Sequence, residues 1–223
     1  MSGVVDLDLD VILPCRDEAS TLPDVLSALP RGCHPLVVDN GSTDETAAVA
    51  RAHGAFVVHE PKPGYGAAVH TGLVNARRTF AGVLDADGSL DPALLPMLLD
   101  PVARGEADLA VGRRRPVRSG VQPWHARAAN SGVAWLLRRR GAAVHDIAAI
   151  RVARRDALLR LEVGDRGFGY PLELLLRAAE AEWRIVEFDV PYRARAGGRS
   201  KVSGSVRGTV RAAFDMTAVL ARR

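Results

Sequence analysis

The stretch PLVVDNGSTDETAAVARAHGAFVVH, residues 35–59, places two short apolar runs on either side of an alanine-rich segment with a polar start. The runs at 35–39 and 55–59 have the length of buried strands. Between them, Ser42 and Glu45 have the spacing of a capping box at the start of a helix, and a glycine stands where that helix would end. This order predicts a strand, a helix and a second strand.

The same alternation continues on both sides of this unit. Apolar runs at 9–14, 81–85 and 107–112 predict further strands. Helices are expected after Thr21, where Asp24 completes a second capping box and Pro23 falls in the first turn, and at 66–78 and 92–103. Strands that alternate with helices of this length predict an α/β fold, with a mostly parallel central sheet and helices on both faces.

The second half of the chain is less regular. We expect a helix at 123–140, a short strand at 147–152, a helix at 171–182 and a strand at 184–190. The segment PYRARAGGRSKVSGSV lacks periodicity and is rich in glycine, serine and arginine, which predicts a flexible basic loop. A helix-like pattern follows at 205–221. We expect a single domain over 1–223.

Composition narrows the class of protein. A hydrophobic content of 48% over 223 residues is enough for one large core, and no apolar stretch is long enough to span a membrane. The N-terminus carries acids and no basic flank, so it does not resemble a signal peptide. Two cysteines without metal-ligand spacing fit a reducing compartment, and we expect a cytoplasmic protein.

Charge is unevenly distributed along the chain. Arginines crowd 113–118, 138–140, 151–155 and 193–211, and the net charge is +4. Such basic regions suit nucleic acid, an anionic membrane surface or phosphorylated small molecules. Aromatic residues make up only 5% of the chain and no nucleic-acid-binding signature is present, so nucleic acid is the weaker interpretation.

Two carboxylates, Asp85 and Asp87, stand one residue apart in VLDADGSLDP, at the predicted end of a strand. An isolated pair of this kind is most simply a solvated turn. Alternatively, carboxylate oxygens this close suit Mg²⁺ or Mn²⁺, with water and a diphosphate as further ligands. In parallel sheets ligands bind beyond the carboxyl ends of the strands, where Asp39 also lies. Together with the late cations Arg195 and Lys201, these acids indicate a nucleotide-sugar site.

Six motifs in register carry a resemblance to a known family over roughly residues 9–210. They are VILPCRDEASTLPDVL, VVDNGSTDET, VLDADGSLDP, VGRRRP, GYPLELLLRA and YRARAGGRSKVSG. The chain resembles the family-2 inverting glycosyltransferases of GT-A fold, a Rossmann-like α/β/α sandwich. It is most similar to the dolichyl- and polyprenyl-phosphate hexose synthases. The resemblance implies a hexose donor of the GDP-mannose or UDP-glucose type and a lipid-phosphate acceptor.

The resemblance also implies residue roles. Donor-binding positions are Pro14, Arg16, Glu18, Val37, Asp39, Asp85, Ala86, Asp87, Arg195 and Lys201; Asp85 and Asp87 would ligate the metal, with Ser89 as a third ligand. Arg114, Arg127 and Ser131 match the acceptor-phosphate site. On this basis 1–112 would be the nucleotide-sugar half, 113–192 the acceptor half, and 193–223 the basic loop and last helix. The family usually has an aromatic-Asn-Glu where this chain has Arg16-Asp17-Glu18.

The acceptor region departs further from the family pattern. Where relatives often carry D-x-x-[SG]-G-F-[RK], this chain reads VHDIAAIRVARRD, which keeps Asp146 and Arg151 but loses the polar-glycine centre. The membrane-spanning C-terminal helices of many relatives are also missing, so contact with a membrane would be peripheral.

The implied reaction is an in-line displacement at the anomeric carbon. A phosphate acceptor is ionised at neutral pH, so Asp87, Arg114 and Arg127 would suffice around the reacting groups. A hydroxyl acceptor would need a carboxylate base. Asp146, Asp165 and Glu173 are candidates for that base; Glu173 is preferred, although it could instead order the arginine-rich loop.

Three alternatives to a lipid-phosphate hexose synthase stay open. A family-2 enzyme acting on a soluble hydroxyl acceptor keeps the same donor site. A sugar nucleotidyltransferase should carry a GxGxR loop after the first strand, and VILPCRDE lacks one. A non-catalytic basic protein at the membrane surface would leave the acids unexplained.

Overall fold

One central sheet organises the part of the chain that the computed structural model describes, residues 7–118, 120–121, 124–147, 149–197 and 219. The strands are β1 (Leu9–Cys15), β2 (Cys33–Asp39), β3 (Phe56–His59), β4 (Phe80–Val83), β5 (Leu109–Pro116), β6 (Ile150–Arg154) and β7 (Ile185–Tyr192). The helices are α1 (Leu22–Ser27), α2 (Thr46–Ala52), α3 (Tyr65–Asn75), α4 (Leu95–Ala103), α5 (Trp124–Arg139), α6 (Arg155–Arg160) and α7 (Tyr170–Glu180), with a 3₁₀ turn η1 (Pro92–Leu94) before α4.

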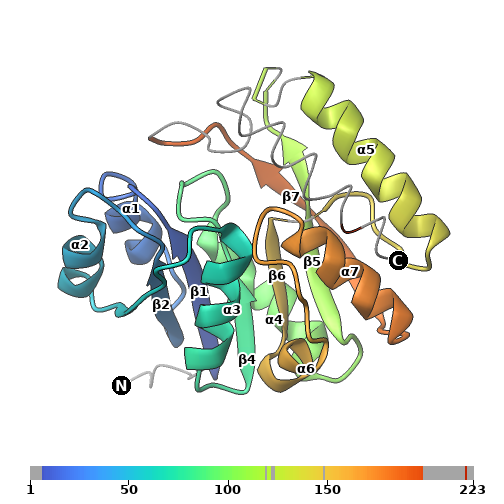
Figure 1. The fold of residues 1–223 in the computed structure, drawn as a ribbon, viewed down its shortest axis with the longest axis horizontal. Coiled ribbons are helices and arrows are strands. Elements are labelled where there is room, and N and C mark those ends of the chain that lie inside the picture. Colours follow the sequence, from blue (N-terminus) through green and yellow to red (C-terminus); the bar gives the residue numbers. More distant parts are fainter. Residues whose placement is uncertain (1–6, 119, 122–123, 148, 198–218, 220–223) are drawn as a thin grey trace.

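The sheet has the order β3-β2-β1-β4-β6-β5-β7 (Figure 1). The pairs β1–β2, β2–β3, β1–β4 and β5–β7 are parallel, whereas β6 runs antiparallel to both β4 and β5. The expectation of a mostly parallel sheet in an α/β fold is therefore confirmed. Reversal of β6 brings its first residues to the edge where the parallel strands end.

Alternating side chains of the strands build two cores, one on each face. On β1, Leu13 packs with α1, α4 and Ala50 of α2, whereas Ile12 packs with α3 and α7. The same alternation separates Val37 from Val38 on β2. Because both faces of the sheet are covered by helices, the strands read as continuous apolar runs in the sequence.

Several local expectations were wrong. The strand predicted at 81–85 ends at Val83, so Asp85 lies in the loop that follows. Neither capping box forms: α2 begins at Thr46, and the Ser42 hydroxyl accepts a hydrogen bond from the Asp17 amide, a residue of another loop. The Thr21 side chain likewise makes no cap on α1. Helix α6 was not predicted.

The chain after Gly197 lies outside the described residues, except for Val219. The expected helix at 205–221, Lys201 and most of the basic loop therefore receive no structural account. Val219 is buried and packs in the core that contains α3 and α7. Within the described residues, the structure contains no helix of the length and apolar character that a membrane span requires.

The helix α3 lies directly on β1 and β2, and Gly72 is the residue that permits this approach. A Cβ atom at this position would lie 2.4 Å from Cγ2 of Ile12 and 3.2 Å from Cγ2 of Val38. Both neighbours are fully buried, so neither has room to move aside.

We predict that Gly72→Ala lowers the free energy of unfolding by about 1–3 kcal/mol, because the added methyl overpacks the core. Urea denaturation gives the measurement. Gly132→Ala in α5 is the matched control, because no atom of the described residues lies within 4 Å of its added Cβ. That variant should gain up to about 1 kcal/mol from helix propensity. Equal stability of the two variants would contradict the packing described here.

Candidate active site

The two acids of the DxD stretch lie in the loop after β4, at the edge where the parallel strands end. Asp87 is buried, and its Oδ1 accepts a hydrogen bond of 2.9 Å from the Ser89 amide. Asp85 keeps some exposure to solvent, although neighbouring atoms surround its carboxylate. The Thr21 hydroxyl donates to the carbonyl oxygen of Ala86, 2.9 Å away, and so ties the loop to the start of α1. The loop therefore holds both carboxylates in fixed positions.

The electrostatic environment of Asp85 is unusual. Burial, followed by the negative charge of Asp87, raises its pKa to about 7. The guanidinium groups of Arg151, Arg114 and Arg195 act in the opposite direction. A carboxyl group with this pKa binds a proton or a cation readily near neutral pH.

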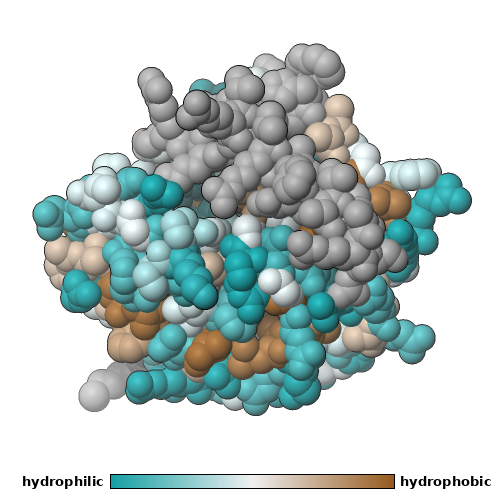
Figure 2. Space-filling view, viewed as in Figure 1, coloured by the Kyte–Doolittle hydropathy of each residue, from teal (hydrophilic) through white to brown (hydrophobic). Residues whose placement is uncertain are grey.

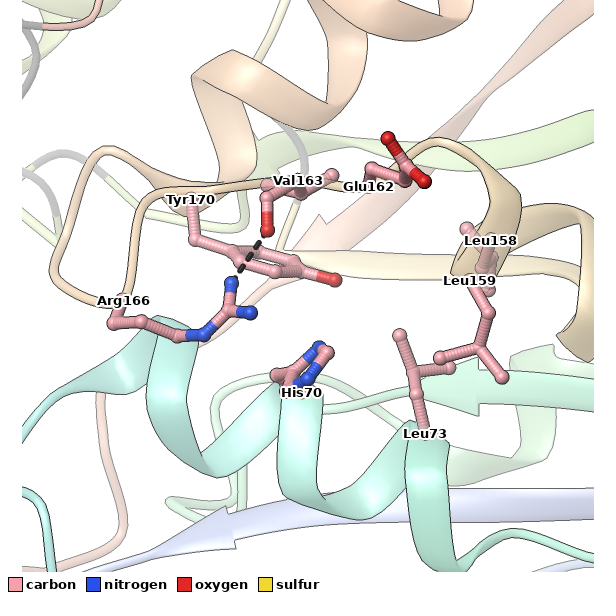
Figure 3. A pocket seen from close by; sticks show the side chains of 8 residues that line it. All are labelled: His70, Leu73, Leu158, Leu159, Glu162, Val163, Arg166 and Tyr170. Atoms are coloured by element: carbon pink, nitrogen blue, oxygen red, sulfur yellow. Dashed lines mark hydrogen bonds between the residues drawn. The ribbon is translucent and has the colours of Figure 1, made fainter.

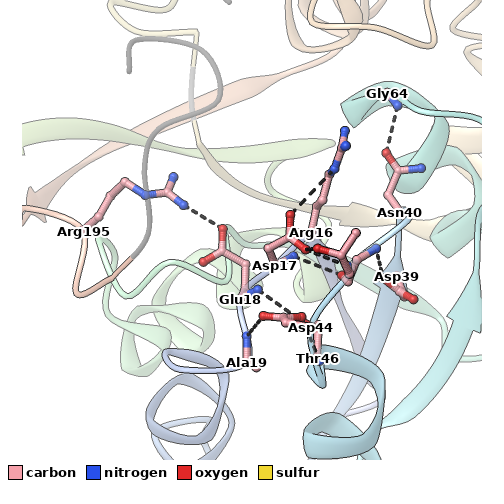
Figure 4. A network of polar contacts seen from close by, with 12 residues as sticks. Arg16, Asp17, Glu18, Ala19, Asp39, Asn40, Asp44, Thr46, Gly64 and Arg195 are labelled. Atoms are coloured by element: carbon pink, nitrogen blue, oxygen red, sulfur yellow. Dashed lines mark hydrogen bonds and ion pairs between the residues drawn. The ribbon is translucent and has the colours of Figure 1, made fainter. Parts of the chain in front are cut away.

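Arg195 bridges two acids at the centre of the site. Its guanidinium nitrogens lie 2.6 Å from Oε1 of Glu18 and 2.7 Å from Oδ2 of Asp87, and both acids are buried. The backbone of this segment contacts the same loop, because the Ala196 amide donates a hydrogen bond to the carbonyl oxygen of Asp87. Figure 4 shows Arg195 reaching Glu18 from a segment far along the chain. Arg195 thus contacts the carboxylates of the site, a contact that the sequence did not predict; its expected contact with a donor diphosphate stays a prediction.

The loops after β1 and β2 are tied together by side chains (Figure 4). The Asp17 carboxylate accepts from the Thr43 amide, and the Asp17 amide donates to the Ser42 hydroxyl. Further on, the Glu18 amide donates to the Thr46 hydroxyl, which in turn bonds Asp44. These contacts explain the STDET sequence better than helix capping does: its polar side chains join two loops.

Asp39 ends β2 at the same edge. Its Oδ1 accepts from the Ser42 amide at 2.9 Å, and its Oδ2 lies 3.5 Å from Nδ1 of His59 at the end of β3. The next residue, Asn40, donates to the carbonyl oxygens of Glu60 and Lys62 and accepts from the Gly64 amide. This asparagine joins the β2 and β3 loops to the start of α3.

Arg114 is held by a bidentate ion pair at the end of β5. Its Nε and Nη2 lie 2.8 and 2.6 Å from the two carboxylate oxygens of Asp146, and its backbone amide donates to the same carboxylate. Its guanidinium also lies 5.6 Å from the centre of the Tyr192 ring. Although burial opposes the charge, Asp146 raises the pKa of Arg114 further. Asp146 is therefore engaged as the partner of an arginine.

Arg151 and two tyrosines complete the floor of the site, and the sequence analysis gave none of them a role. Arg151 is buried on β6, and its Nη2 lies 3.4 Å from the hydroxyl of Tyr65 at the start of α3. Burial raises the pKa of both Tyr65 and Tyr170, while the charge of Arg151 opposes that rise. Spacing could not have found this group, because three separate segments contribute to it.

Some of the predicted site residues are not placed so that their side chains could contact a ligand together with the carboxylates. The Val37 side chain is fully buried in the core shared with α1 and α4, so only its backbone could face a ligand. Pro14 is partly exposed near the end of β1, and Arg16 is exposed beside Asp17. Arg127 and Ser131 are exposed on α5, and no hydrogen bond or ion pair among the described residues joins either to Arg114.

Glu173 has contacts that favour a structural role. It is buried, and its two oxygens accept from the amides of Gly164 and Asp165, while Arg177 pairs with it at 2.7 Å. Burial alone would raise its pKa, but these donors lower the pKa below its usual value. It orders the segment before α7, and a carboxylate so well stabilised is a weak base.

A cavity of about 250 Å³ lies away from the carboxylates, between α3, α6 and α7. Figure 3 shows His70 and Leu73 of α3 facing Tyr170 and the leucines of α6, with Arg166 closing one side by its hydrogen bond to the Val163 carbonyl. None of the acids of the DxD stretch lines it. This cavity is distinct from the candidate active site.

Comparison with known proteins places this geometry in a family. The family model described as glycosyl transferase family 2 matches residues 10–161. The chain belongs to glycosyl transferase family 2. A glycosyltransferase of Mycobacterium tuberculosis named only as uncharacterised is 56% identical over 211 residues, which cover 94% of this chain and 96% of that protein.

Two further similarities concern proteins with named activities. Polyprenol monophosphomannose synthase of Mycolicibacterium smegmatis is 36% identical to this glycosyltransferase, over 87% of this chain and 81% of that enzyme. The solved structure of glucosyl-3-phosphoglycerate synthase from Mycobacterium tuberculosis, in complex with Mn²⁺ and uridine diphosphate, superposes with a TM-score of 0.76. That match covers 96% of this chain and 78% of that one at 22% identity, so it confirms the GT-A fold.

The carboxylates of this glycosyltransferase fit a divalent cation that a ligand helps to hold. No three histidine, cysteine or acidic side chains of the described residues gather closely enough to enclose a metal alone. Mg²⁺, however, is commonly held by one or two carboxylates together with substrate phosphates. Asp85 and Asp87 supply such a pair. Beside them, the buried hydroxyl of Ser89, which lies near the Tyr192 hydroxyl, is a further oxygen.

We predict that Glu173→Gln lowers the free energy of unfolding by about 1–3 kcal/mol, because one of two buried acceptor oxygens becomes an amide donor and the charge beside Arg177 is lost. Because the pKa of Glu173 is lowered in the folded state, its contribution is complete above the usual pKa of 4.5 and disappears as the pH falls through the folded value. The stability difference from wild type should therefore shrink below pH 4.5 in urea titrations.

Glu180→Gln, an exposed change on the same helix, is the control and should leave stability unchanged. Glycosyl transfer per folded molecule should survive Glu173→Gln. Loss of transfer with unchanged stability would instead identify Glu173 as a base.

Proposed function

We propose that this glycosyltransferase moves a hexose from a nucleotide sugar to a polyprenyl phosphate, with inversion and with Mg²⁺ or Mn²⁺ bound. The observation that carries the proposal is the carboxylate pair Asp85 and Asp87 at the carboxyl edge of the sheet, with Arg114, Arg151 and Arg195 around it. The carboxylates can hold a metal ion, and the arginines beside them can hold phosphate oxygens. Together they suit a diphosphate leaving group. The name of the mycolicibacterial relative supports the lipid-phosphate acceptor.

On the donor side, residues 1–112 supply the nucleotide-sugar contacts. Asp39, at the end of β2, would accept a hydrogen bond from the nucleoside, within a frame that includes Pro14, Arg16 and Glu18. Asp85 and Asp87, with Ser89 nearby, would hold the metal, which neutralises charge on the diphosphate when bound. Arg195 and Lys201 would neutralise the remaining charge, and Arg195 already contacts Asp87.

On the acceptor side, residues 113–192 supply Arg114 and Arg127, with Ser131 one helical turn beyond Arg127. A phosphate monoester with a second pKa of about 6 is ionised at neutral pH, so it attacks without a general base. The contacts of the structure agree with such an acceptor, because Asp146 and Glu173, two candidates for a base, are both paired with arginines. Arg114 is held rigidly by Asp146, which fits a positioning role.

Peripheral contact with the inner face of a membrane belongs to the same proposal. Arg113 and Arg115 lie in the last part of β5 and Arg118 follows the strand; Arg115 and Arg118 are exposed. Asp189 neutralises part of this charge, because it pairs with Arg115 at 2.8 Å. Arginines near an anionic surface contribute about 1 kcal/mol each.

We predict that Asp87→Asn folds but loses transfer by at least about 10²-fold, the scale expected when a group that stabilises the charge of the leaving diphosphate is removed. Transfer from labelled GDP-mannose and UDP-glucose is measured with Mn²⁺, and thermal unfolding monitors the fold. Asp100→Asn, an exposed change on α4, is the matched control. Full activity of Asp87→Asn, or metal-independent transfer by the wild type, would contradict the assigned role.

We further predict transfer to a polyprenyl phosphate in detergent and none to the corresponding polyprenol. Arg127→Ala should raise the apparent KM for the acceptor by about tenfold, because one charge-assisted contact is lost, and should leave nucleotide affinity unchanged. Arg140→Ala, beyond the other end of α5, is the control. A neutral Arg127→Ala together with transfer to a soluble phosphorylated alcohol would refute the lipid acceptor, while the donor half of the proposal would stand.

A further inference from the structure

Five arginines line a cavity of about 380 Å³ where α3 leads into β4 and β6 leads into α6. Its lining consists of Arg77, Arg78, Thr79, Arg154, Arg155, Asp156, Ala157 and Arg160. In Figure 1, α6 and the turn from α3 into β4 lie together at the lower edge of the sheet, and Figure 2 shows hydrophilic side chains along that edge. Asp156 is the sole acid of this lining. None of the residues assigned above to the donor, the metal or the acceptor belongs to this lining.

The cavity lies at the opposite end of the sheet from the active site. The antiparallel register pairs Arg154 with Phe80 at one end of β4 and Arg151 with Val83 at the other. Arg151 lies beside Asp85, whereas Arg154 lines the cavity. Three residues of extended chain separate the two arginines by roughly 10 Å. A ligand in the cavity would therefore leave the carboxylate site free.

Two of these arginines, Arg77 and Arg154, lie against aromatic rings. The guanidinium of Arg77 lies 5.7 Å from the centre of the Phe56 ring, and that of Arg154 lies 5.1 Å from the Phe80 ring. Aromatic faces attract a cation without neutralising it. Arg155 donates to the carbonyl oxygens of Leu73 and Val74, which end α3, in addition to its pair with Asp156.

The backbone beneath the cavity is equally fixed. Asp10 accepts hydrogen bonds from the amides of Arg77 and Arg78, at 2.5 and 2.9 Å, and Asp8 accepts from the Thr79 amide. The Arg155 amide donates to the Thr79 carbonyl and joins the two turns. These bonds hold the arginines of both segments at one cavity, so their mutual repulsion is already overcome when a ligand arrives.

We propose that this arginine cavity is a binding site for a phosphate-bearing anion, separate from the active site and independent of the function proposed above. The planar guanidinium fork matches phosphate oxygens and binds them through two parallel hydrogen bonds. Five guanidinium groups outnumber the carboxylate of Asp156 in the lining and those of Asp8 and Asp10 beneath it. This excess of positive charge suits a ligand with several negative charges, such as a diphosphate. A free phosphorylated metabolite and an anionic lipid headgroup both carry this chemistry.

The test uses the full chain with a chelator present, so that diphosphate at the carboxylate site has no metal to bridge it. Inorganic pyrophosphate should raise the temperature of unfolding of the wild type, because a ligand of the folded state stabilises it. The double variant Arg154→Gln with Arg160→Gln should bind pyrophosphate about tenfold more weakly or worse, since two charge-assisted contacts are lost. The control pair Arg31→Gln with Arg140→Gln removes the same charge from exposed positions and should bind as the wild type does.

Flotation with vesicles distinguishes the two sources of phosphate. Binding to phosphatidylglycerol vesicles but not to phosphatidylcholine vesicles, lost only in the cavity variant, identifies a lipid headgroup. A pyrophosphate effect without cavity-dependent flotation identifies a free phosphate compound. If neither probe binds, or if the cavity variant binds both probes as well as the control pair does, the proposal is wrong. Unfolding of each variant without ligand verifies that the fold is retained.

Discussion

The repulsion between Asp85 and Asp87 is the constraint on which the rest of the site depends. Two carboxylates held largely out of water cannot both stay ionised unless cations lie close to them. The cations come from distant parts of the chain: Arg114 lies near the end of β5, Arg151 is the second residue of β6, and Arg195 follows β7. The reversed direction of β6 is part of this solution, because it brings the first residues of a strand to the edge where the parallel strands end.

In the region proposed for the acceptor, residues 113–192, two acids hold arginines in place. Asp146 fixes Arg114 through both of its oxygens, and Glu173 fixes Arg177 and the turn before α7. A carboxylate in such a pair is a poor proton acceptor, since its charged form is already stabilised. These two pairings support the proposed ionised acceptor, which would not need to lose a proton.

The sequence predicted the strands and the acids at their ends because those features are local. Apolar runs of strand length mark β1, β2 and β5, and Asp39 and Asp87 stand close to the ends of strands. Prediction from the sequence failed where a polar side chain forms a hydrogen bond with a residue far along the chain. Ser42 and Thr21 have capping-box spacing, yet their hydroxyls bond Asp17 and Ala86 of other loops. The role of Arg151 depends on the antiparallel pairing of β6, and no sequence spacing contains that information.

The contact between Arg195 and Glu18 has a consequence for the order of events during synthesis. These residues are separated by 177 positions, and the Arg195 side chain also reaches Asp87. Contacts of such large separation form late, because the closure of a long loop costs entropy before the contact offsets it. On a ribosome, the sheet around β1, β2 and β4 can form before Arg195 has emerged. A nascent chain would thus carry its acids without their counter-charge, and the site would reach its final electrostatic state only when almost the whole domain is translated.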